Sequence, residues 1–267
     1  MFFDTGMEFQ ATKDHLAELE HKYGIAINRV YAKMPVAMAC HKYGVPFLSK
    51  QVSEFIRRLQ IHNFKWEDRS FDELYKEYPK CKAALRWWCN SFGENSKTNI
   101  SRNKHLKEFI IQEPPDFSIS PMCCQKAKKD TAHSFQKENN ADLIVQGVRK
   151  AEGGARSTAI HSCFTQNSFE ADTLRPLFWF KKKDCEQYDD LFAIEHSDCY
   201  SKYGLCRTGC ACCPFGRDFE RELEAAQTFE PKLHRLSNLV FGKSYEYTRK
   251  YREFCKKMEE NNAAYPK

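Results

Sequence analysis

The sequence predicts an α/β protein organised around a parallel sheet, and three observations lead to this class. Residues 1–31 have the pattern of a strand, a tight turn, a helix and a second strand, which is the usual unit of parallel sheets. Residues 142–146 form a further apolar run that ends at Gly147. Helical patterns occupy most of the remaining chain. With 267 residues, 42% of them hydrophobic, the chain can form one large domain with a sizeable core.

The N-terminal unit begins with a short apolar segment. Residues 1–3 (Met-Phe-Phe) run into residues 4–6 (Asp-Thr-Gly), which predicts the end of a buried strand followed by a tight turn. A helix with one apolar face follows, and Gly24 is a natural C-terminal stop for it. Residues 25–31 then have the pattern of the second strand.

Helices are expected to dominate the next hundred residues. Ser49 is a predicted N-cap ahead of an apolar stripe, and residues 70–73 (Ser-Phe-Asp-Glu) form a capping-box pattern. Residues 80–90 continue helically, and a later helix is stopped by two prolines at 114–115. Residues 122–137 predict another helix, which begins with a pair of cysteines.

The C-terminal half is expected to contain one more strand and then helices. Residues 176–180 are predicted as the strand, and residues after Pro214 as helical to the end, with the last helix at 245–259. We expect an α/β domain over residues 1–200 with a helical insertion at about 35–140. Residues 201–267 are expected to pack on the same domain.

Charge and hydropathy narrow the classes of function. Lys and Arg outnumber Asp and Glu by six, a surplus that suits an anionic ligand such as a nucleotide. The surplus does not indicate a nucleic-acid footprint, although it leaves nucleic acid open as a partner. No apolar run approaches the roughly 20 residues of a membrane span, and the N-terminus lacks the pattern of a signal peptide. We therefore expect a cytoplasmic protein without membrane contact.

The thirteen cysteines include two groups with the spacing of a metal site. Cys123 and Cys124 are adjacent, and Cys210 and Cys213 form a C-x-x-C, in which one turn can direct both sulfurs at the same centre. In a reducing compartment such clusters point to metal or redox chemistry more than to disulfides. The alternative is a set of buried free cysteines, which behave as small apolar residues. The nearby residues Cys199, Cys206 and Cys212 are interpreted as non-ligands.

At these residues the sequence resembles the phosphoadenosine-phosphosulfate reductase family, within the adenine-nucleotide α-hydrolase (PP-loop ATP pyrophosphatase) fold. The four cysteines are similar to the [4Fe-4S] ligand pattern of the adenylyl-sulfate reductase branch. Residues 147–152 (Gly-Val-Arg-Lys-Ala-Glu) resemble its G-x-R-x-x-E-S loop, and residues 3–6 resemble its second-strand nucleotide loop. The most specific match is the stretch from 204 to 216.

The resemblance implies a doubly wound, mostly parallel sheet of Rossmann-like type with a helical C-terminal part. Because ligands of open α/β sheets bind outside the carboxyl ends of the strands, an adenylyl nucleotide is expected at two such loops. The implied cofactor is a [4Fe-4S] cluster, with zinc as the alternative. Asp4 could instead be a turn-forming residue, and Arg149 a solvated loop arginine. The expected nucleotide-binding residues are Asp4, Thr5, Gly6, Gly147, Arg149 and Arg156, and the expected metal ligands are Cys123, Cys124, Cys210 and Cys213.

The phosphate-binding signature of the family, S-G-G-K-D-S at the end of its first strand, does not occur in the sequence. The first residues instead resemble the second strand, so the expected sheet lacks its first strand and has two unpaired inner edges. Three explanations stay open: an upstream start of translation, a second chain that supplies the strand, or a degenerate remnant.

The reaction stays open among three hypotheses, and no catalytic residue is assigned. One is reduction of adenylyl sulfate or its 3′-phosphorylated form with a thioredoxin-like thiol reductant. Another is ATP-dependent sulfur transfer to an acceptor or nucleic-acid modification, in a phage, mobile-element or defence role. The third is a non-catalytic accessory protein. Gly153 replaces the family's serine, residues 9–12 (Phe-Gln-Ala-Thr) replace F-P-E-T, and Cys255 lies in a predicted helix, where we expect it to be inert.

Overall fold

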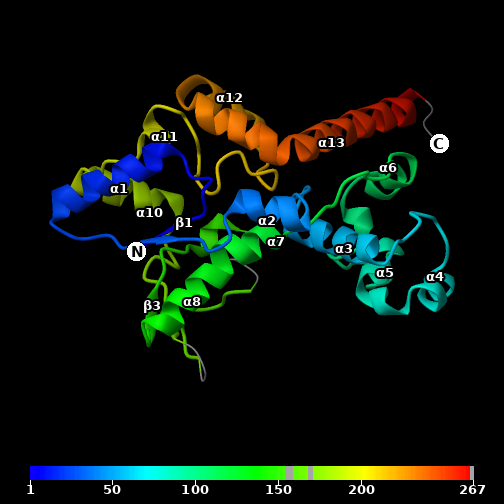
Figure 1. The fold of residues 1–267 in the computed structure, drawn as a ribbon, viewed down its shortest axis with the longest axis horizontal. Helices are drawn as coiled ribbons and strands as arrows, with labels where there is room; N and C mark the ends of the chain where they lie inside the picture. The colour runs from blue at the N-terminus through cyan, green and yellow to red at the C-terminus, as the bar shows by residue number, and fades with distance from the viewer. Residues whose placement is uncertain (154–158, 168–170, 265–267) are drawn as a thin grey trace.

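The structure is a computed structural model that describes residues 1–153, 159–167 and 171–264, with side chains through residue 261. It is a mixed α/β protein in which helices predominate and the strands are short (Figure 1). The α/β class and the presence of parallel strand pairs are therefore confirmed.

The predicted strand–helix–strand unit is present at the N-terminus. β1 (Phe2–Asp4) pairs in parallel with β2 (Arg29–Tyr31), and α1 (Gln10–Tyr23) connects them. α1 ends at Gly24, which adopts the left-handed conformation expected of a C-terminal stop. β2 is shorter than predicted, because residues 25–27 do not pair with β1 and Asn28 contributes only its carbonyl, which accepts the N–H of Phe2 at 2.8 Å.

The second sheet has the order β3–β5–β4. β3 (Leu143–Val145) confirms the strand predicted at 142–146 and pairs in parallel with β5 (Asp172–Leu174), while β4 (Phe164–Thr165) runs antiparallel to β5. The prediction of a strand at 176–180 is wrong, because the strand ends at Leu174 and residues 176–179 form turns. Pro176 has no N–H to give to a ladder, so the apolar run that follows it packs as a turn.

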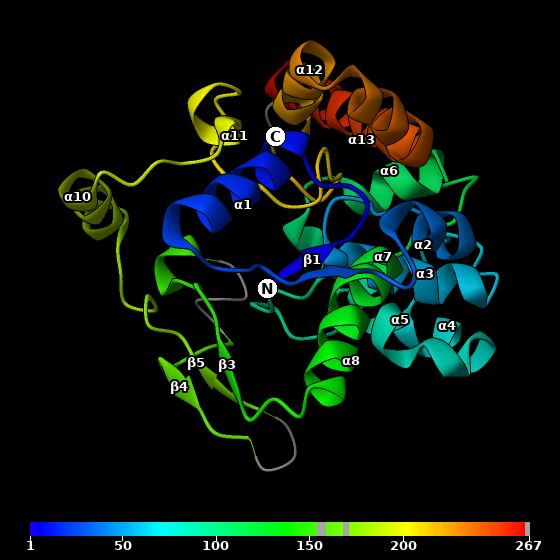
Figure 2. The same ribbon diagram turned by 60° about the vertical axis from the view of Figure 1, so that its left-hand side comes forward.

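The two sheets are separate within the described residues. β1 has β2 as its single strand partner, and β3 has β5, so each strand keeps one edge without a strand among the residues described. Figure 2 shows β3, β4 and β5 as a group of their own, apart from the strand β1. Two unpaired inner edges are what a sheet without its first strand is expected to have, and the doubly wound arrangement itself stays a prediction.

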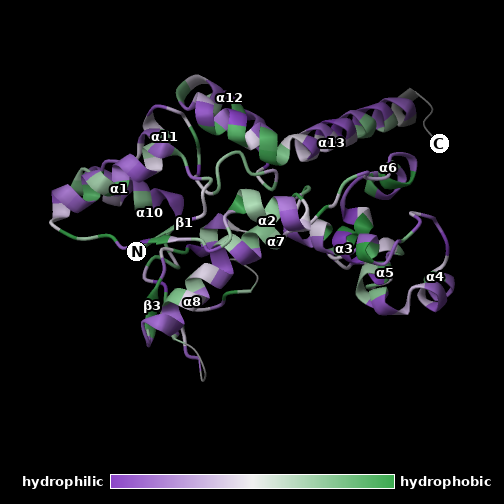
Figure 3. Ribbon diagram, in the orientation of Figure 1, coloured by the Kyte–Doolittle hydropathy of each residue, from purple (hydrophilic) through white to green (hydrophobic). Residues whose placement is uncertain are grey.

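A helical layer follows β2 and contains a core of its own. Ser49 caps α3 by accepting the N–H of Val52 at 3.2 Å, and the predicted capping box of Ser70 and Glu73 opens α4. Trp87, Trp88 and other large apolar side chains fill this core. Hydrophobic residues gather where these helices meet (Figure 3). The helices of the layer are α2 (Val36–Tyr43), α3 (Lys50–Ile61), α4 (Phe71–Glu77), α5 (Lys82–Trp88) and α6 (Leu106–Gln112), with short 3₁₀ turns at Pro79–Cys81 and Ile100–Arg102.

The predicted helix at 122–137 consists of three successive segments. α7 (Met122–Cys124) leads into a π-helical stretch at Gln125–Lys129, and α8 (Asp130–Glu138) completes it. π-Helical turns are rare and occur often at functional sites. Here the π turn directly follows the cysteine pair.

The C-terminal part is helical, as predicted, and connects two cores. α13 contributes Phe241 and Tyr245 to a core shared with α1, α2 and α7, and Tyr247 and Tyr251 to the core of the helical layer. The predicted helix at 245–259 is the second half of this much longer helix. The C-terminal helices are α10 (Lys182–Phe192), α11 (Asp198–Ser201), α12 (Phe219–Phe229) and α13 (Pro231–Ala264), and a 3₁₀ turn lies at Lys150–Glu152. Across the described part of the chain, no helix combines the length and the apolarity needed to cross a membrane.

Candidate metal centre and nucleotide loop

The two cysteine pairs, far apart in the sequence, come together in the structure. Cys123 and Cys124 lie in α7, and their thiols are in hydrogen-bond contact. Cys213 interacts electrostatically with Cys210 and with both cysteines of α7, and Cys210 interacts with Cys124. The structure thus brings the two predicted cysteine pairs within electrostatic range of each other.

Because they are neighbours on a helix, Cys123 and Cys124 have different surroundings. Successive side chains of a helix point about 100° apart, so two neighbours cannot face the same direction. Cys123 is buried and contacts the thiol of Cys40 on α2, whereas Cys124 is half-buried and faces Cys210. α7 starts where the N–H of Met122 donates to the hydroxyl of Ser120 at 3.1 Å.

Three hydrogen bonds hold the loop of the C-x-x-C motif. The N–H of Ala211 donates to the carbonyl of Met7 at 2.5 Å, and the N–H of Cys212 donates to Glu222 Oε2 at 2.7 Å. The hydroxyl of Tyr245 donates to the carbonyl of Cys212 at 2.5 Å. Cys212 adopts a left-handed backbone conformation with φ of 56°. Its fully buried side chain lies beside Ser237 of α13, while Cys213 interacts with Cys210 and Cys124.

Sequence reasoning missed two groups beside the thiols. Cys40 is buried against Cys123, but it lies alone in an apolar helix and has no ligand spacing to reveal it. Lys128 follows Cys124 by one helical turn, and its ammonium group interacts with Cys210, Cys124 and Glu8. Burial lowers the pKa of Lys128, but these three neighbours raise it by more, so the lysine stays charged. The spacing of Lys128 from Cys124 was the one signal in the sequence that could have identified it.

The predicted nucleotide loop at the end of β1 touches the cysteine loop directly. The hydroxyl of Thr5 lies 3.4 Å from the sulfur of Cys210 and also donates to Glu8 Oε1 at 2.6 Å. Gly6 is exposed and has φ of +83°, and a Cβ there would come within 3.3 Å of Pro35. The conformation of this turn therefore requires glycine.

Asp4 is engaged within its own turn. Its carboxylate accepts the N–H of Gly6 at 2.8 Å and pairs with Lys13 at 2.7 Å. Burial raises the pKa of Asp4, but these two partners lower it by more, so the net shift is downward. The turn-forming interpretation of Asp4 thus accounts for its contacts in this structure.

The second predicted nucleotide loop follows β3, and its arginine makes its contacts away from the turn at residues 4–6. Arg149 donates from Nη1 to the sulfur of Cys185 at 3.0 Å, and its Nε lies 3.5 Å from Glu152. A Cβ at Gly147 would meet no atom within 4 Å, so nothing in the ligand-free loop requires glycine there. Among the described residues, no hydrogen bond or ion pair joins Arg149 to the turn at residues 4–6. Arg156 lies outside the described residues.

The thiols are protonated at neutral pH when no metal is present. Burial raises the pKa of Cys210, and it raises the pKa of Cys213 to about 12. A metal centre would displace these protons, because thiolates are the ligating form. In the part of the chain that the structure describes, no group of three or more His, Cys, Asp or Glu side chains is arranged to hold a metal ion.

Comparison with known proteins gives no family for this chain. No family model matches it, and no curated protein matches it at a significant level. The assignment of a function therefore depends on the residues of the site itself.

Proposed function

We propose that this chain carries a four-iron iron–sulfur cluster on Cys123, Cys124, Cys210 and Cys213. We further propose that it binds an adenylyl nucleotide at the adjoining turn of residues 4–6, in the manner of the phosphoadenosine-phosphosulfate reductase family. One observation carries the proposal. Two cysteine pairs from distant segments meet beside the turn that closes β1.

The donor set supports a cluster more than a single zinc ion. Four thiolates around one zinc must lie about 3.8 Å from one another, because each Zn–S bond is about 2.3 Å long and the geometry is tetrahedral. A four-iron cluster binds each thiolate to a different iron, so its four thiolates can lie farther apart than four thiolates around one zinc ion. Lys128 supplies a positive charge beside the thiolates. When bound, the cluster would provide a fixed charge distribution next to the nucleotide.

The neighbouring turn has features that a nucleotide site needs. Gly6 is exposed and carries no side chain, so a ligand can approach the backbone closely there. Lys13 pairs with Asp4 and Lys128 interacts with Glu8, so two ammonium groups near the turn are available to a phosphate or sulfate group.

The open edges of β1 and β3 support a further part of the proposal. A further parallel strand at such an edge would satisfy backbone groups that have no strand partner in the described chain. We propose that a segment bearing the phosphate-binding loop occupies this position, supplied upstream in a longer chain or by a second chain.

For the reaction, we propose transfer of the sulfonyl group of an adenylyl sulfate to a partner thiol. The nucleoside monophosphate leaves as the S–S bond forms, and a second thiol of the thioredoxin-like partner then releases sulfite by forming a disulfide. Cys255 does not suit the attacking role, because α13 holds its thiol 3.4 Å from the carbonyl of Lys104. Sulfite release from adenylyl sulfate supports this reaction, whereas pyrophosphate release from ATP would support ATP-dependent sulfur transfer in its place.

The cluster is tested by measuring iron, zinc and acid-labile sulfide in protein purified without oxygen. We expect about four irons and four sulfides per chain in the wild type, lost together in Cys213→Ser. Cys206→Ser is the matched control, because Cys206 is an exposed cysteine of the same segment and should leave both values unchanged. One zinc without sulfide, or equal iron in the two variants, would contradict the proposal.

A further inference from the structure

We propose that the chain has a second anion-binding site, in a pocket between the loop after β3 and the start of α12. Four short segments line it: Glu152–Gly153, Leu205–Arg207, Phe215–Asp218 and the first turn of α12. The cavity volume of about 500 Å³ lies within the usual range of small-molecule sites. None of the four proposed metal ligands and none of residues 4–6 lines this pocket, so the inference does not depend on the proposed function.

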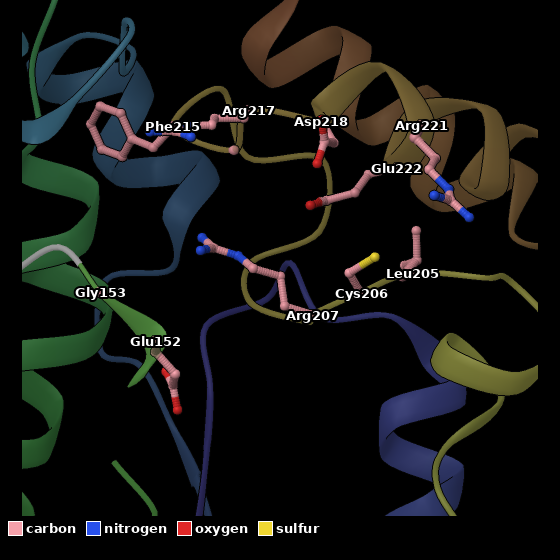
Figure 4. A pocket seen from close by; sticks show the side chains of 11 residues that line it. Glu152, Gly153, Leu205, Cys206, Arg207, Phe215, Arg217, Asp218, Arg221 and Glu222 are labelled. Carbon is pink, nitrogen blue, oxygen red and sulfur yellow. The ribbon is translucent and has the colours of Figure 1, made fainter. Parts of the chain in front are cut away.

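Arg207, Arg217 and Arg221 line the pocket, and Arg207 interacts electrostatically with Glu222 of the same pocket. No hydrogen bond or ion pair with a carboxylate involves Arg207, Arg217 or Arg221 within the described part of the chain. The guanidinium group of Arg207 extends into the space between Glu152 and the Phe215–Asp218 segment (Figure 4). The guanidinium group of Arg221 lies so close to Gly204 that a Cβ at that glycine would come within 3.1 Å of it.

Two of the three carboxylates that line the pocket also have a partner outside it. Glu152 pairs with Arg149, and Glu222 accepts the backbone N–H of Cys212 at 2.7 Å, even though its carboxylate points into the pocket (Figure 4). Asp218 makes no side-chain cap on α12, whose first-turn N–H groups add positive potential at the same end. With Arg149, which pairs with Glu152, four arginines stand against the three carboxylates Glu152, Asp218 and Glu222, which leaves one positive charge in excess around the cavity.

The chemistry that fits this excess is a phosphate monoester or a sulfate. Guanidinium groups bind such oxyanions through paired N–H donors, and several arginines around one cavity can share them. The side chains of Leu205 and Phe215 add an apolar wall, which would suit the organic part of a nucleotide. The same anion could also arrive as free inorganic phosphate, so the test has to separate the two sources.

The exposed Cys206 makes occupancy of this pocket measurable at one position. Cys206 lines the pocket, whereas Cys163 is also exposed but is not among the pocket residues. Alkylation by iodoacetamide, mapped by mass spectrometry, should slow at Cys206 roughly tenfold when ligand is present at ten times its Kd. Cys163 should react at an unchanged rate. The probes are adenosine 5′-monophosphate, inorganic phosphate and adenosine as the uncharged control.

The variants Arg207→Gln and Arg217→Gln identify the groups that bind. We expect each to weaken phosphate binding at low ionic strength by roughly 10-fold to 100-fold, because each loses charge-assisted hydrogen bonds. Arg235→Gln is the matched control, since Arg235 is an exposed arginine of α13 outside the pocket. All three positions are exposed, so the variants should fold alike, which circular dichroism verifies.

Each outcome decides the proposal. Protection of Cys206 by the nucleotide at lower concentration than inorganic phosphate supports a nucleotide ligand, and equal protection by both supports a free oxyanion. Protection by adenosine alone, no protection by either phosphate compound, or equal affinity of Arg207→Gln and Arg235→Gln overturns it. Iron content, measured in the same samples, reports on the cluster separately.

Discussion

Single residues decide which groups of this site can act together. Cys212 and Cys213 are neighbours, yet the left-handed backbone at Cys212 places one thiol in the core beside Ser237 and the other among the proposed ligands. Such a conformation costs a non-glycine residue about 1 kcal/mol or more. Hydrogen bonds from Tyr245 and to Glu222 hold it in place.

The two predicted loop glycines differ in what the fold demands of them. Gly6→Ala should lower the free energy of unfolding by about 1–2 kcal/mol, because the residue has a positive φ and its new Cβ would press on Pro35. Gly147→Ala is the control and should leave stability unchanged, since its Cβ would meet nothing. Urea denaturation of both variants measures the difference. Equal stability of the two variants would show that the turn at Gly6 tolerates a side chain.

At the scale of elements, α13 connects the two cores of the protein. One stretch of the helix packs Phe241 and Tyr245 against the cysteine loop, and the next packs Tyr247 and Tyr251 into the aromatic core of the helical layer. The predicted C-terminal helix was correct in type but too short. Different faces of α13 pack against different parts of the protein along its length. The sequence therefore lacks the single apolar stripe by which helical periodicity is recognised.

Tyr245→Phe tests this connection. The variant should lower the free energy of unfolding by about 1–2 kcal/mol, because the buried carbonyl of Cys212 loses its hydroxyl donor while the packing of the ring is kept. Tyr188→Phe on α10 provides the comparison, as that side chain is half exposed. Chemical denaturation gives both values, and a loss no larger than that of Tyr188→Phe would mean that the Tyr245 hydroxyl contributes nothing.

At the scale of the whole molecule, the strand β3 is much more exposed than the helix α5 in the core of the helical layer. Parallel strands are normally covered on both faces, but Leu143 and Val145 of β3 are 47% and 62% exposed. In contrast, Leu85 and Trp88 of α5 are fully buried. A further strand at the open edge of β3 would change this balance, as the proposed function requires.

Hydrogen exchange measures the same contrast. Amides of β3 should exchange roughly 100-fold faster than those of α5. β3 is an exposed strand with a single strand partner, and opening it locally costs far less free energy than opening a buried helix. Addition of the partner that supplies the missing strand should remove most of the difference. Equal protection of β3 and α5 in the chain alone would mean that the strand edges are already covered.

The sequence by itself determined the local elements. The first strand–helix–strand unit, the caps at Ser49 and Ser70 and the strand before Gly147 follow from periodicity and end signals, because these depend on neighbours within a few residues. The prediction of a strand at 176–180 was wrong because local patterns do not contain the partners of a strand. An apolar run after a proline can pack as a turn as well as a strand, and the ladder partners of β5 decided between them.

Only the tertiary structure decided which groups meet. Spacing marked the four cysteines, but it could not show that Cys40, Lys128 and Thr5 surround them, nor that Arg149 faces Cys185. The pocket of Arg207, Arg217 and Arg221 was equally hidden, since it forms between segments that packing brings together. Local patterns encode local conformation, whereas a site made from distant segments depends on the burial of both cores at once.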